Sequence, residues 1–411
     1  MSKPPSNRPL RLMYAAGPGD IIGTWRHWKE NRDDPGQVAM TYSGQFYDVC
    51  KQLGAQGYAI ASHPRHETVG DDQFRVEHRP IPFAKSSSAL KYHLGQLISA
   101  FQMSWRAFRY RADALVICDG TCHWFPLRLL PMLGIQVIPT IHCMLWLKSH
   151  PPTGRLKRFI ARLDRAFWRR SAKAILSAST DITEQIDQTT GNNHRPVIPF
   201  LPTYRPDTFE AAPPPESRTP FRVLFAGRIE RYKGVFDLLE IARQFSSAGR
   251  TSIEFDLCGT GSDIDALRQQ IADAGLTQTF RAHGHCDRTK MRQLFRDCHV
   301  LIVPTTTDFA EGFNQVVVEG VLAGRPVITS SICPALDYVQ DAVVEVPPDN
   351  VPAYHDAILR LHDDQTLYEQ KRAASVALQS QFYDPSRGWA QALLKSLDKE
   401  SISTTMPLSS L

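Results

Sequence analysis

The 411-residue sequence lacks the cysteine spacing of a zinc site or of a disulfide framework. Its eight cysteines are scattered, the closest two are Cys118 and Cys122, and no C-x-x-C pair occurs. Zinc modules and small disulfide-stabilised domains carry closely spaced cysteine pairs. We therefore expect neither kind of site, and we expect reduced, buried thiols of the sort found in cytoplasmic proteins.

An uninterrupted apolar run is missing as well. The nearest approach to one is LRLLPMLGIQVIPTIHCMLWL (127–147), which arginine, proline, glycine and histidine interrupt. A membrane-spanning helix needs about 20 consecutive apolar residues, so this stretch predicts a helix, a turn and a buried strand. The N-terminal MSKPPSNRPLRLMYAAG does not resemble a secretory signal and leads directly into a predicted strand. Both absences favour a cytoplasmic protein.

Predicted strands and helices alternate along most of the chain, without an internal repeat or a low-complexity tract. This alternation predicts an α/β fold with parallel sheets and helices on both faces, and the length suits two domains of about 200 residues. Six prolines in 200–220 indicate a joint. The predicted parts are an N-terminal domain (1–200), a Pro-rich linker (201–220), a C-terminal domain (221–380) and a helix that returns to the N-terminal domain and ends in a disordered tail (381–411). In the N-terminal domain we expect strands at 10–15, 58–62, 113–118, 135–140 and 173–178, and helices near 44–55, 88–110, 124–133, 155–171 and 180–189.

The segment VLFAGRIERYKG (223–234) places charge where a predicted strand ends. The strand stops at Gly227 and is followed by Arg228 and Lys233. Ligands of open α/β sheets bind at the carboxyl ends of strands, and a guanidinium next to an ammonium suits a diphosphate. A second strand end, FDLCGTG (255–261), carries glycines at 259 and 261. A G-x-G pattern alone is usually only a tight turn.

The segment PTTTDFAEGFNQVVVEGVLAG (304–324) predicts a strand end, a loop and a helix. Glu311 precedes the predicted helix start, where the backbone amides of Gly312, Phe313 and Asn314 suit a hydroxyl-rich or phosphorylated ligand. Glu319 follows two helical turns later, and we expect it to face the same mouth. By itself this spacing equally fits a surface helix with two solvated glutamates.

Together these motifs resemble those of the retaining GT-B glycosyltransferases of the glycogen-synthase-like superfamily. The resemblance rests on G-R-x4-K-G (227–234), C-G-x-G (258–261) and E-G-F-x5-E-G-x-x-A-G-x-P-V (311–327). It is specific over about 220–345 and diffuse over the N-terminal half. It implies two Rossmann-like domains that face a central cleft.

The resemblance also implies roles for individual residues. Arg228 and Lys233 would hold the donor diphosphate, Glu311 and the amides after it would contact the sugar hydroxyls, and Glu319 would hold the ribose. The donor-binding residues expected on this basis are Gly17, Gly19, Arg228, Lys233, Gly259, Gly261, Gly312, Phe313, Asn314 and Glu319, and the expected catalytic residues are His142 and Glu311. Gly320 departs from the family pattern, which usually has alanine there.

The N-terminal domain is expected to hold the acceptor. Its first predicted strand ends at YAAGPGD (14–20), where Gly17 and Gly19 would let a substrate approach the backbone. About twenty residues follow before the family's helix-opening glycine region, including Trp25 and Trp28, and we interpret them as an acceptor-binding loop or as a solvated excursion. His142 stands at the end of the strand 138–142, where a histidine of the family contacts the transferred sugar; a lone histidine is otherwise more often structural.

Charge divides unevenly between the two halves. Residues 1–200 hold 26 Lys and Arg against 15 Asp and Glu, a net charge of +11, and the remainder holds 21 against 27. Eight basic residues fall in 155–173, whose apolar side chains share one helical face that we expect to pack on the sheet. That face comprises Leu156, Phe159, Ile160, Leu163 and Phe167. The basic face then suits an anionic membrane surface, and nucleic acid is the weaker choice because no recognised binding motif accompanies it.

The combined pattern predicts a cytoplasmic, peripherally membrane-associated transferase that moves a sugar from a nucleotide-diphosphate sugar to a glycan or lipid-linked acceptor, with retained configuration. Cell-surface polysaccharide or glycolipid synthesis fits such an acceptor. Neither cofactor nor metal is expected, because Arg228, Lys233 and helix amides can stabilise the leaving diphosphate. The alternatives are a nucleotide-sugar epimerase or phosphorylase, a binding protein without turnover, and a retaining hydrolase that uses Glu311 and Glu319. The sugar, the base, the acceptor and the oligomeric state are not readable from the sequence.

Overall fold

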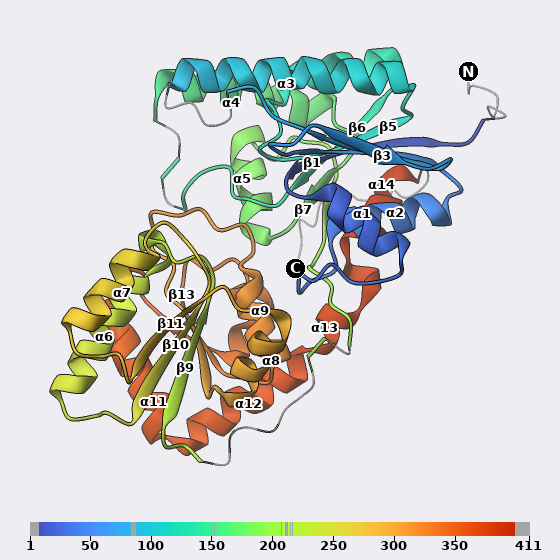
Figure 1. The fold of residues 1–411 in the computed structure, drawn as a ribbon. Coiled ribbons are helices and arrows are strands. Elements are labelled where there is room, and N and C mark those ends of the chain that lie inside the picture. Colours follow the sequence, from blue (N-terminus) through green and yellow to red (C-terminus); the bar gives the residue numbers. More distant parts are fainter. Residues whose placement is uncertain are drawn as a thin grey trace, which may run out of the picture. The chain divides into compact units, whose positions relative to one another are not determined.

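The computed structural model describes residues 8–83, 88–148, 150–151, 153–206, 208–209, 213, 215 and 217–398. These residues form two compact units (Figure 1). Unit 1 lies within Met1–Leu145, Pro152–Thr203 and Asp384–Leu411, and unit 2 within Trp146–Pro151 and Tyr204–Tyr383. The disordered tail expected at the end of the chain falls on residues outside the described ones.

Unit 1 is built on an eight-stranded sheet with the order β3-β4-β2-β1-β5-β6-β7-β8. All neighbouring pairs are parallel except β3 and β4, which are antiparallel. The strands are β1 (Arg11–Pro18), β2 (Gln56–Ser62), β3 (Glu67–Gly70), β4 (Phe74–Arg79), β5 (Ala114–Cys118), β6 (Gln136–Ile141), β7 (Ile175–Ser177) and β8 (Val197–Pro199). Strand order reverses between β1 and β5, which is the topological switch point where such sheets bind ligands.

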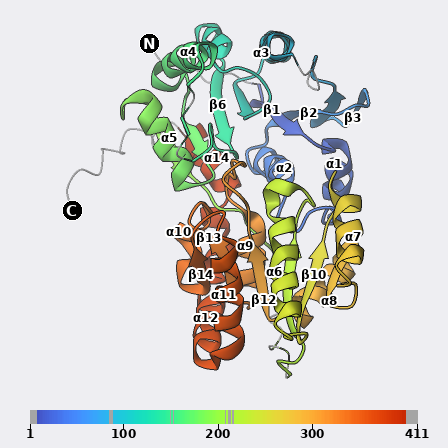
Figure 2. The same ribbon diagram turned by 90° about the vertical axis from the view of Figure 1, so that its left-hand side faces the viewer.

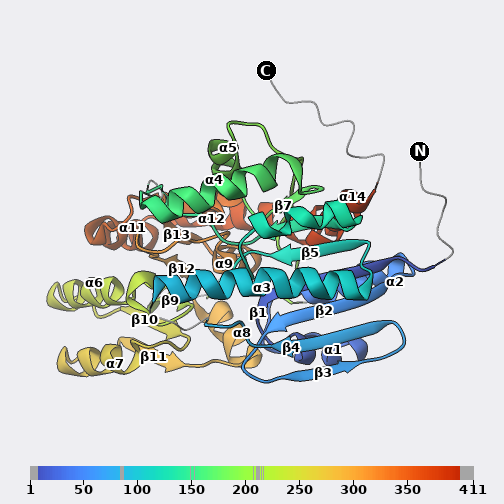
Figure 3. The ribbon, with the colours of Figure 1, turned by 90° about the horizontal axis from the view of Figure 1, so that it is seen from above.

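Helices cover both faces of this sheet (Figures 1 and 3). On one face lie α3 and α4, which both pack against η1, and on the other lie α1, α2 and α14. The helices of unit 1 are α1 (Ile21–Lys29), α2 (Tyr42–Gln52), α3 (Ala89–Tyr110), α4 (Arg155–Arg170), α5 (Thr180–Thr190) and α14 (Trp389–Leu397), with 3-10 turns η1 (Phe125–Leu129), η2 (Pro131–Leu133) and η5 (Pro385–Arg387). The C-terminal helix α14 belongs to unit 1 because it buries Trp389 and Leu393 there and packs on α2.

Unit 2 is a six-stranded, fully parallel sheet with the order β11-β10-β9-β12-β13-β14 (Figure 2). Its strands are short, and the central strand, with the sequence VLIV, is apolar throughout, as expected for a strand that is buried on both faces. They are β9 (Phe221–Ala226), β10 (Ile253–Cys258), β11 (Phe280–Gly284), β12 (Val300–Val303), β13 (Val327–Ser330) and β14 (Val343–Val346). The strand order reverses between β9 and β12, and these are the strands that precede Arg228 and Glu311.

The helices of unit 2 pack on both faces of its sheet. They are η3 (Arg231–Lys233), α6 (Val235–Ser247), α7 (Ile264–Asp273), α8 (Arg288–Asp297), α9 (Gln315–Leu322), α10 (Leu336–Val339), η4 (Gln340–Ala342), α11 (Val351–Asp363), α12 (Gln365–Leu378) and α13 (Ser380–Tyr383). A methyl group at Gly320 would lie 2.7 Å from Leu301 Cδ2, so glycine lets α9 pack close to β12. The predicted α/β class with two parallel-sheet domains is confirmed.

Two local predictions are wrong. The segment after β1 is not a loop: Ile21–Lys29 forms α1, which Asp20 caps through a 2.7 Å hydrogen bond from the Gly23 amide. Trp25 is buried, so it serves the core of unit 1 and not an acceptor. The apolar face of α4 is fully buried only at Phe167; Ile160 and Leu163 are half-buried, and Leu156 and Phe159 are exposed.

Candidate functional site

Three loops at the carboxyl ends of β9, β10 and β12 pack against one another in unit 2. A methyl group at Gly259 would collide with the Gly227 carbonyl oxygen, and one at Gly261 would collide with that of Ile229. Gly234 has a φ of +73° and a Cβ there would collide with the Pro304 carbonyl oxygen. Only glycine fits these positions, because a larger residue would push the loops apart. The glycines therefore act by bringing three strand ends close together.

Hydrogen bonds hold the first two loops in register. The Gly227 amide donates to the Cys258 carbonyl at 2.9 Å, and the Ile229 amide donates to the Thr260 carbonyl at 3.0 Å. Glu230 accepts a 3.0 Å bond from the Ser262 amide. The backbone on either side of Arg228 is thus anchored, and the side chain is presented from a rigid loop.

Arg228, Lys233 and Glu311 meet in one cluster in unit 2. The Lys233 ammonium forms an ion pair with the Glu311 carboxylate, and both side chains are largely buried. The Arg228 guanidinium lies 5.2 Å from the centre of the Phe309 ring, and the Lys233 ammonium lies 4.4 Å from it. Cation–π contacts of this kind orient a cation without neutralising it. The structure thus brings together three residues that are 83 positions apart at most along the chain.

Burial changes the acid–base chemistry of this cluster. Burial first, and then the charge of Arg228, lower the pKa of Lys233 to about 8. An anion that binds beside Lys233 and Arg228 would relieve the repulsion between the two cations and favour the protonated amine. The cluster is therefore suited to a ligand that carries more than one negative charge.

Glu319 and Asn314 are two further polar groups in the interior of unit 2. Glu319 is 8% exposed, and burial raises its pKa to about 7. No basic side chain among the described residues pairs with it. The Asn314 amide nitrogen is buried and has no hydrogen-bond partner in the part of the chain that the structure describes. Buried polar groups are usually paired, so these two indicate a polar ligand.

Asn314 also fixes where α9 begins. Its φ is +69°, in the left-handed region that asparagine tolerates better than most residues, and α9 starts at Gln315. Gly312 and Phe313 are buried immediately before this turn, and the Phe313 ring lies 5.6 Å from that of Tyr338. The expected amide-lined segment is therefore a rigid turn next to Glu311.

Unit 1 presents its own polar groups at the carboxyl ends of β1, β5 and β6. Asp119, after β5, accepts hydrogen bonds from the amides of His142 at 2.9 Å and Cys143 at 3.1 Å. Gly17 lies close to Asp119: a Cβ at Gly17 would be 3.8 Å from the Asp119 carbonyl oxygen. A Cβ at Gly19 would have no neighbouring atom within 4 Å. Neither glycine is required by packing.

His142 has one ring nitrogen occupied and one free. Its Nε2 lies 3.1 Å from Thr140 Oγ1, and its Nδ1 is buried with no hydrogen-bond partner among the described residues. Trp389 Nε1 donates to the same hydroxyl at 2.9 Å. The Thr140 oxygen accepts from Trp389 and keeps its own proton to donate; when that proton goes to Nε2, the proton of a neutral imidazole lies on Nδ1. Burial lowers the pKa of His142, partly offset by Asp119, which favours that neutral form.

Sequence reasoning missed several residues that shape these sites. Phe309 and Tyr232 stack at 4.6 Å and support the two cations, while Asp119 orients the backbone at His142. Phe309 stands two residues before Glu311, a signal that was present in the motif itself. Trp389 carried no readable signal, because its partner Thr140 is 249 positions away in the chain. Among the described residues, no group of three or more His, Cys, Asp or Glu side chains is arranged to hold a metal ion.

Comparison with known sequences gives a family for the C-terminal half. A sequence family described as Glycosyl transferases group 1 matches residues 207–376. The alpha-D-kanosaminyltransferase of Streptomyces kanamyceticus is 24% identical over 289 residues, which cover 66% of this chain and 72% of that protein. The matched range contains the loops that carry Arg228, Lys233, Glu311 and Glu319.

Comparison with solved structures extends the likeness to both units. Anabaena Alr3699/HepE in complex with UDP has a TM-score of 0.66 at 15% identity, covering 95% of this chain and 99% of that one. WaaG, a glycosyltransferase involved in lipopolysaccharide biosynthesis, has a TM-score of 0.63 at 14% identity, covering 93% and 99%. At these identities the comparison establishes the fold.

Proposed function

We propose that the chain is a GT-B glycosyltransferase of the glycogen-synthase-like superfamily and that it transfers a sugar from a nucleotide-diphosphate sugar to a glycan or lipid-linked acceptor with retained configuration; the family match over 207–376 and the shared fold support this. The observation that carries the proposal is the cluster of Arg228, Lys233 and Glu311 at adjacent strand ends of unit 2. Two cations beside one carboxylate form a site in which a diphosphate can take the place of Glu311 as partner of Lys233.

In this proposal the leaving diphosphate is stabilised by Arg228 and Lys233. Charge that develops on the leaving oxygens is met by two cations already fixed on a rigid loop, which is how enzymes lower the energy of such transition states. These cations supply the positive charge that a divalent ion supplies elsewhere, so we propose that neither metal nor cofactor is required. Because the diphosphate replaces Glu311 as the partner of Lys233, the Glu311 carboxylate becomes free to contact the sugar hydroxyls.

The remaining residues have roles that follow from their surroundings. Glu319, buried and without a cationic partner, suits the ribose hydroxyls of the nucleotide. The turn formed by Gly312, Phe313 and Asn314 suits the sugar, since Asn314 has an unpaired amide nitrogen. In unit 1, the Nδ1–H of His142 suits a sugar hydroxyl, and the backbone at Gly17 and Gly19 leaves room for the donor. Gly259 and Gly261 contribute to the donor site differently, because they let the loops that carry it pack closely together.

The comparisons support a nucleotide donor. The Anabaena protein with the same fold was solved with UDP, and the Streptomyces relative is named as a transferase of a sugar. An acceptor in cell-surface polysaccharide or glycolipid synthesis agrees with the role printed for WaaG. A nucleotide-sugar-processing enzyme of epimerase type, a retaining hydrolase and a non-catalytic binder remain the alternatives.

The diphosphate site is tested by substitution. We expect Arg228→Ala and Lys233→Ala each to weaken binding of UDP, or of whichever of UDP, GDP and ADP stabilises the wild type, by roughly 1.5–3 kcal/mol, the scale of a charge-assisted hydrogen bond. Arg231→Ala is the matched control, because Arg231 lies in the same 3-10 turn but stacks on Phe236 instead. Wild-type affinity in both cluster variants would remove the assignment.

Substitutions at Glu311 and Glu319 distinguish a transferase from a hydrolase and from a binding protein. We expect Glu311→Gln to abolish sugar transfer while nucleotide binding survives, and Glu319→Ala to weaken nucleotide binding. Sugar release from a donor panel is measured with and without acceptor, because a hydrolase releases sugar without one and a binder releases none. Trapping of a glycosyl ester on Glu311 or Glu319 would favour a covalent retaining mechanism.

We further propose that unit 1 docks on an anionic membrane. Of the 15 exposed large hydrophobic side chains among the described residues, 11 belong to α3, η1, η2 or α4. The exposed arginines of α4 lie among them, and a basic residue close to an anionic membrane contributes about 1 kcal/mol. Among the helices formed by the described residues, none combines the length and apolar character needed to span a bilayer.

The α4 contribution is tested with Arg158→Gln, Arg162→Gln and Arg165→Gln combined. Arg169 is left intact because it donates a 3.1 Å hydrogen bond to the Thr190 carbonyl. At low salt the triple variant is expected to co-sediment more weakly than wild type with vesicles that contain phosphatidylglycerol, while UDP binding by unit 2 persists. Wild-type protein that ignores such vesicles at low salt would contradict membrane docking.

A further inference from the structure

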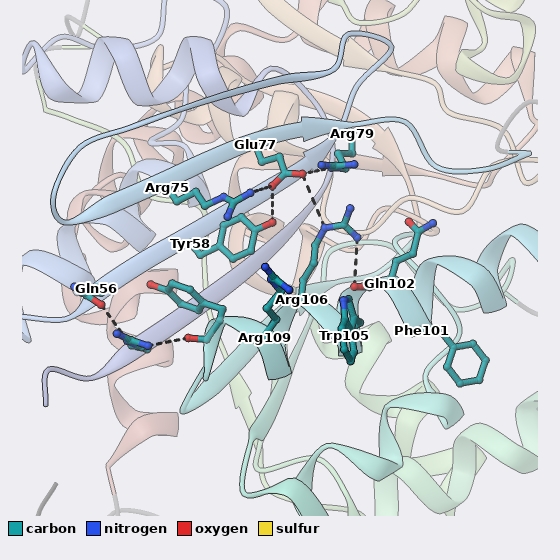
Figure 4. Close-up of a pocket in the computed structure, with 12 residues that line it drawn as sticks. Gln56, Tyr58, Arg75, Glu77, Arg79, Phe101, Gln102, Trp105, Arg106 and Arg109 are labelled. Atoms are coloured by element: carbon teal, nitrogen blue, oxygen red, sulfur yellow. Dashed lines mark hydrogen bonds and ion pairs between the residues drawn. The ribbon is translucent and has the colours of Figure 1, made fainter.

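Unit 1 contains a cavity of about 720 Å³ between α3 and the strands β1, β2 and β4 (Figure 4). Arg11 and Gln56, which line it, are the first residues of β1 and β2, so the cavity reaches the amino ends of these strands. His142 follows the carboxyl end of β6, at the opposite edge of the same sheet. Gly17, Gly19 and His142, the groups of unit 1 proposed to contact the donor, are not among the residues that line the cavity.

Positive charge dominates the lining of this cavity. Five arginines and a single acid, Glu77, contribute to it, which leaves a surplus of four positive charges. The arginines are Arg11, Arg75, Arg79, Arg106 and Arg109. Such a surplus in a partly enclosed space attracts an anion more strongly than the same charges spread over an open surface.

Glu77 holds three of these arginines in place, and its single negative charge cannot balance their three positive charges. Its carboxylate is fully buried, accepts a 2.6 Å hydrogen bond from the Tyr58 hydroxyl, and forms ion pairs with Arg79 and, at 3.1 Å, with Arg75 (Figure 4). Arg106 approaches the same carboxylate at 3.9 Å. Burial alone would raise the pKa of Glu77, but Tyr58 and the arginines outweigh it and lower that pKa, so the carboxylate stays ionised. Three guanidinium groups are thus held around one acid.

Two other arginines are placed without an acidic partner. Arg11 bonds Gln56 Oε1 at 3.0 Å and the Tyr110 carbonyl at 3.2 Å, both neutral groups. Arg109 is exposed, and among the described residues its guanidinium has no hydrogen bond or ion pair. Guanidinium groups bind phosphate oxygens in pairs of parallel hydrogen bonds. The cavity therefore has unused donors suited to a phosphate.

The rim of the cavity is aromatic and continues into the apolar surface of α3. Phe101 and Trp105 line the cavity, yet they are 60% and 61% exposed. Leu94 and Phe108 are also exposed on α3 and continue this surface. A ligand that fits both features has an anionic head joined to an apolar body.

We infer that this cavity binds the phosphate headgroup of an anionic membrane lipid, with Arg106 and Arg109 on the phosphate and Trp105 and Phe101 at the level of the acyl chains. The inference rests on the membrane docking proposed above and names the lipid contact of that surface. Aromatic side chains with one apolar and one wet side are favoured at membrane interfaces. Free phosphate shares the head chemistry but would leave the aromatic rim uncovered.

The test separates this site from diffuse attraction. Co-sedimentation is measured with vesicles of phosphatidylglycerol in phosphatidylcholine at low salt and at 0.5 M NaCl, where attraction between exposed charges is largely screened. We expect the double variant Arg106→Gln, Arg109→Gln to bind at least tenfold more weakly than wild type at 0.5 M NaCl. The charge-matched control, Arg158→Gln with Arg162→Gln on α4, is expected to approach wild type there. Melting curves check that the double variant folds. Arg109→Gln alone is a second variant, and it should not disturb folding because the Arg109 guanidinium has no hydrogen bond or ion pair among the described residues.

Each outcome decides between the two proposals. Two results at 0.5 M NaCl would overturn the headgroup site: equal binding by wild type and by the Arg106→Gln, Arg109→Gln variant, or loss of all binding by wild type. Membrane docking through α4 would stand in both cases. No binding of wild type at low salt would overturn docking and headgroup site together. Saturable binding of glycerol 3-phosphate by wild type, without vesicle binding, would then assign the cavity to a soluble phosphate ester.

Discussion

At the residue scale, Lys233 is held in an ion pair with Glu311, and its pKa is lowered to about 8. A bound diphosphate favours the charged amine, so the pKa of Lys233 rises in the complex and binding takes up a proton when pH exceeds 8. We expect affinity for the nucleoside diphosphate to fall by about tenfold between pH 7 and pH 9. Isothermal titration across this range measures it.

Lys233→Arg is the control for this pH dependence. Arginine stays protonated throughout the range, so this variant should bind with an affinity that changes much less between pH 7 and pH 9. An equally steep decline in wild type and variant would show that another group is responsible.

Glu319 gives a prediction about stability. Burial raises its pKa to about 7, above the value of about 4.3 of an unfolded chain, so the ionised form is disfavoured in the folded state. This penalty is absent below the unfolded pKa, grows as pH rises, and is complete above the folded pKa. We expect Glu319→Gln to raise the melting temperature of unit 2 at pH 8 by a few degrees, with a free-energy gain on the order of 2 kcal/mol.

The same variant should gain little at pH 4.5, where Glu319 is protonated in the folded state and about half protonated in the unfolded chain, so most of the penalty is absent. Calorimetry at the two pH values provides the comparison. Unchanged melting at pH 8 would mean that the carboxylate finds partners on ionisation. If Glu319 contacts the ribose, the stabilised variant should also bind nucleotide more weakly, so stability and function oppose each other at this residue.

At the scale of elements, α14 positions His142 from the far end of the chain. Trp389 donates to Thr140, whose proton is then available for His142 Nε2. We expect Trp389→Phe to keep most of the packing but to release this constraint, lowering kcat by threefold to tenfold, the scale of one neutral hydrogen bond. Nitrogen-resolved NMR of His142 should show a larger fraction with the proton on Nε2.

The affinity of unit 2 for nucleotide provides the control for Trp389→Phe. It should not change, because α14 belongs to unit 1 and the diphosphate cluster lies in unit 2. A variant with normal kcat and a normal tautomer would show that Thr140 alone holds the imidazole.

Helix α4 shows that a sequence pattern can predict a helix without predicting which of its residues are buried. Its helical period and its basic residues are visible in the sequence, and the helix spans Arg155–Arg170. Its apolar face was expected to pack throughout, but Leu156 and Phe159 are exposed. Periodicity shows which side chains share a face, and only the neighbouring elements determine what covers that face. Helix α1, in contrast, was missed although its sequence carries a helical signal: Ile21, Trp25 and Trp28 stand at helical spacing after Asp20.

At the scale of the whole molecule, unit 1 is completed by residues from the end of the chain. Trp389, Ala392 and Leu393 of α14 are buried in it. We expect a chain that ends at Tyr383 to unfold in unit 1 at a lower temperature, since loss of a buried tryptophan alone costs about 3–5 kcal/mol. Unit 2 should still bind nucleoside diphosphate and keep its own melting transition.

A chain that ends at residue 398 is the matched control, because it retains α14 in full. It should melt like the complete chain in scanning calorimetry. Loss of nucleotide binding on truncation at 383, with unit 2 still folded, would contradict the independence of the two units.

The α/β class, the division into two sheets and the likeness of 207–376 to a glycosyltransferase family were all predictable from the sequence. Each depends on patterns within about thirty residues: the alternation of strand and helix, glycine at a strand end, and charge just after it. Strand ends of a parallel sheet necessarily lie at one edge, so Arg228, Lys233 and Glu311 could be placed together before their contacts were seen. The roles of the individual site residues stay predictions.

Only the tertiary structure decided which groups are buried, paired or left open. The pKa of Lys233 and of Glu319, the tautomer of His142 and the arginine cavity beneath α3 all depend on residues distant in the chain. Burial and hydrogen bonding depend on distances in space, which a local sequence pattern does not encode. The sequence by itself therefore determined which chemical groups stand at the strand ends. The packing within each unit determined the protonation and the orientation of those groups.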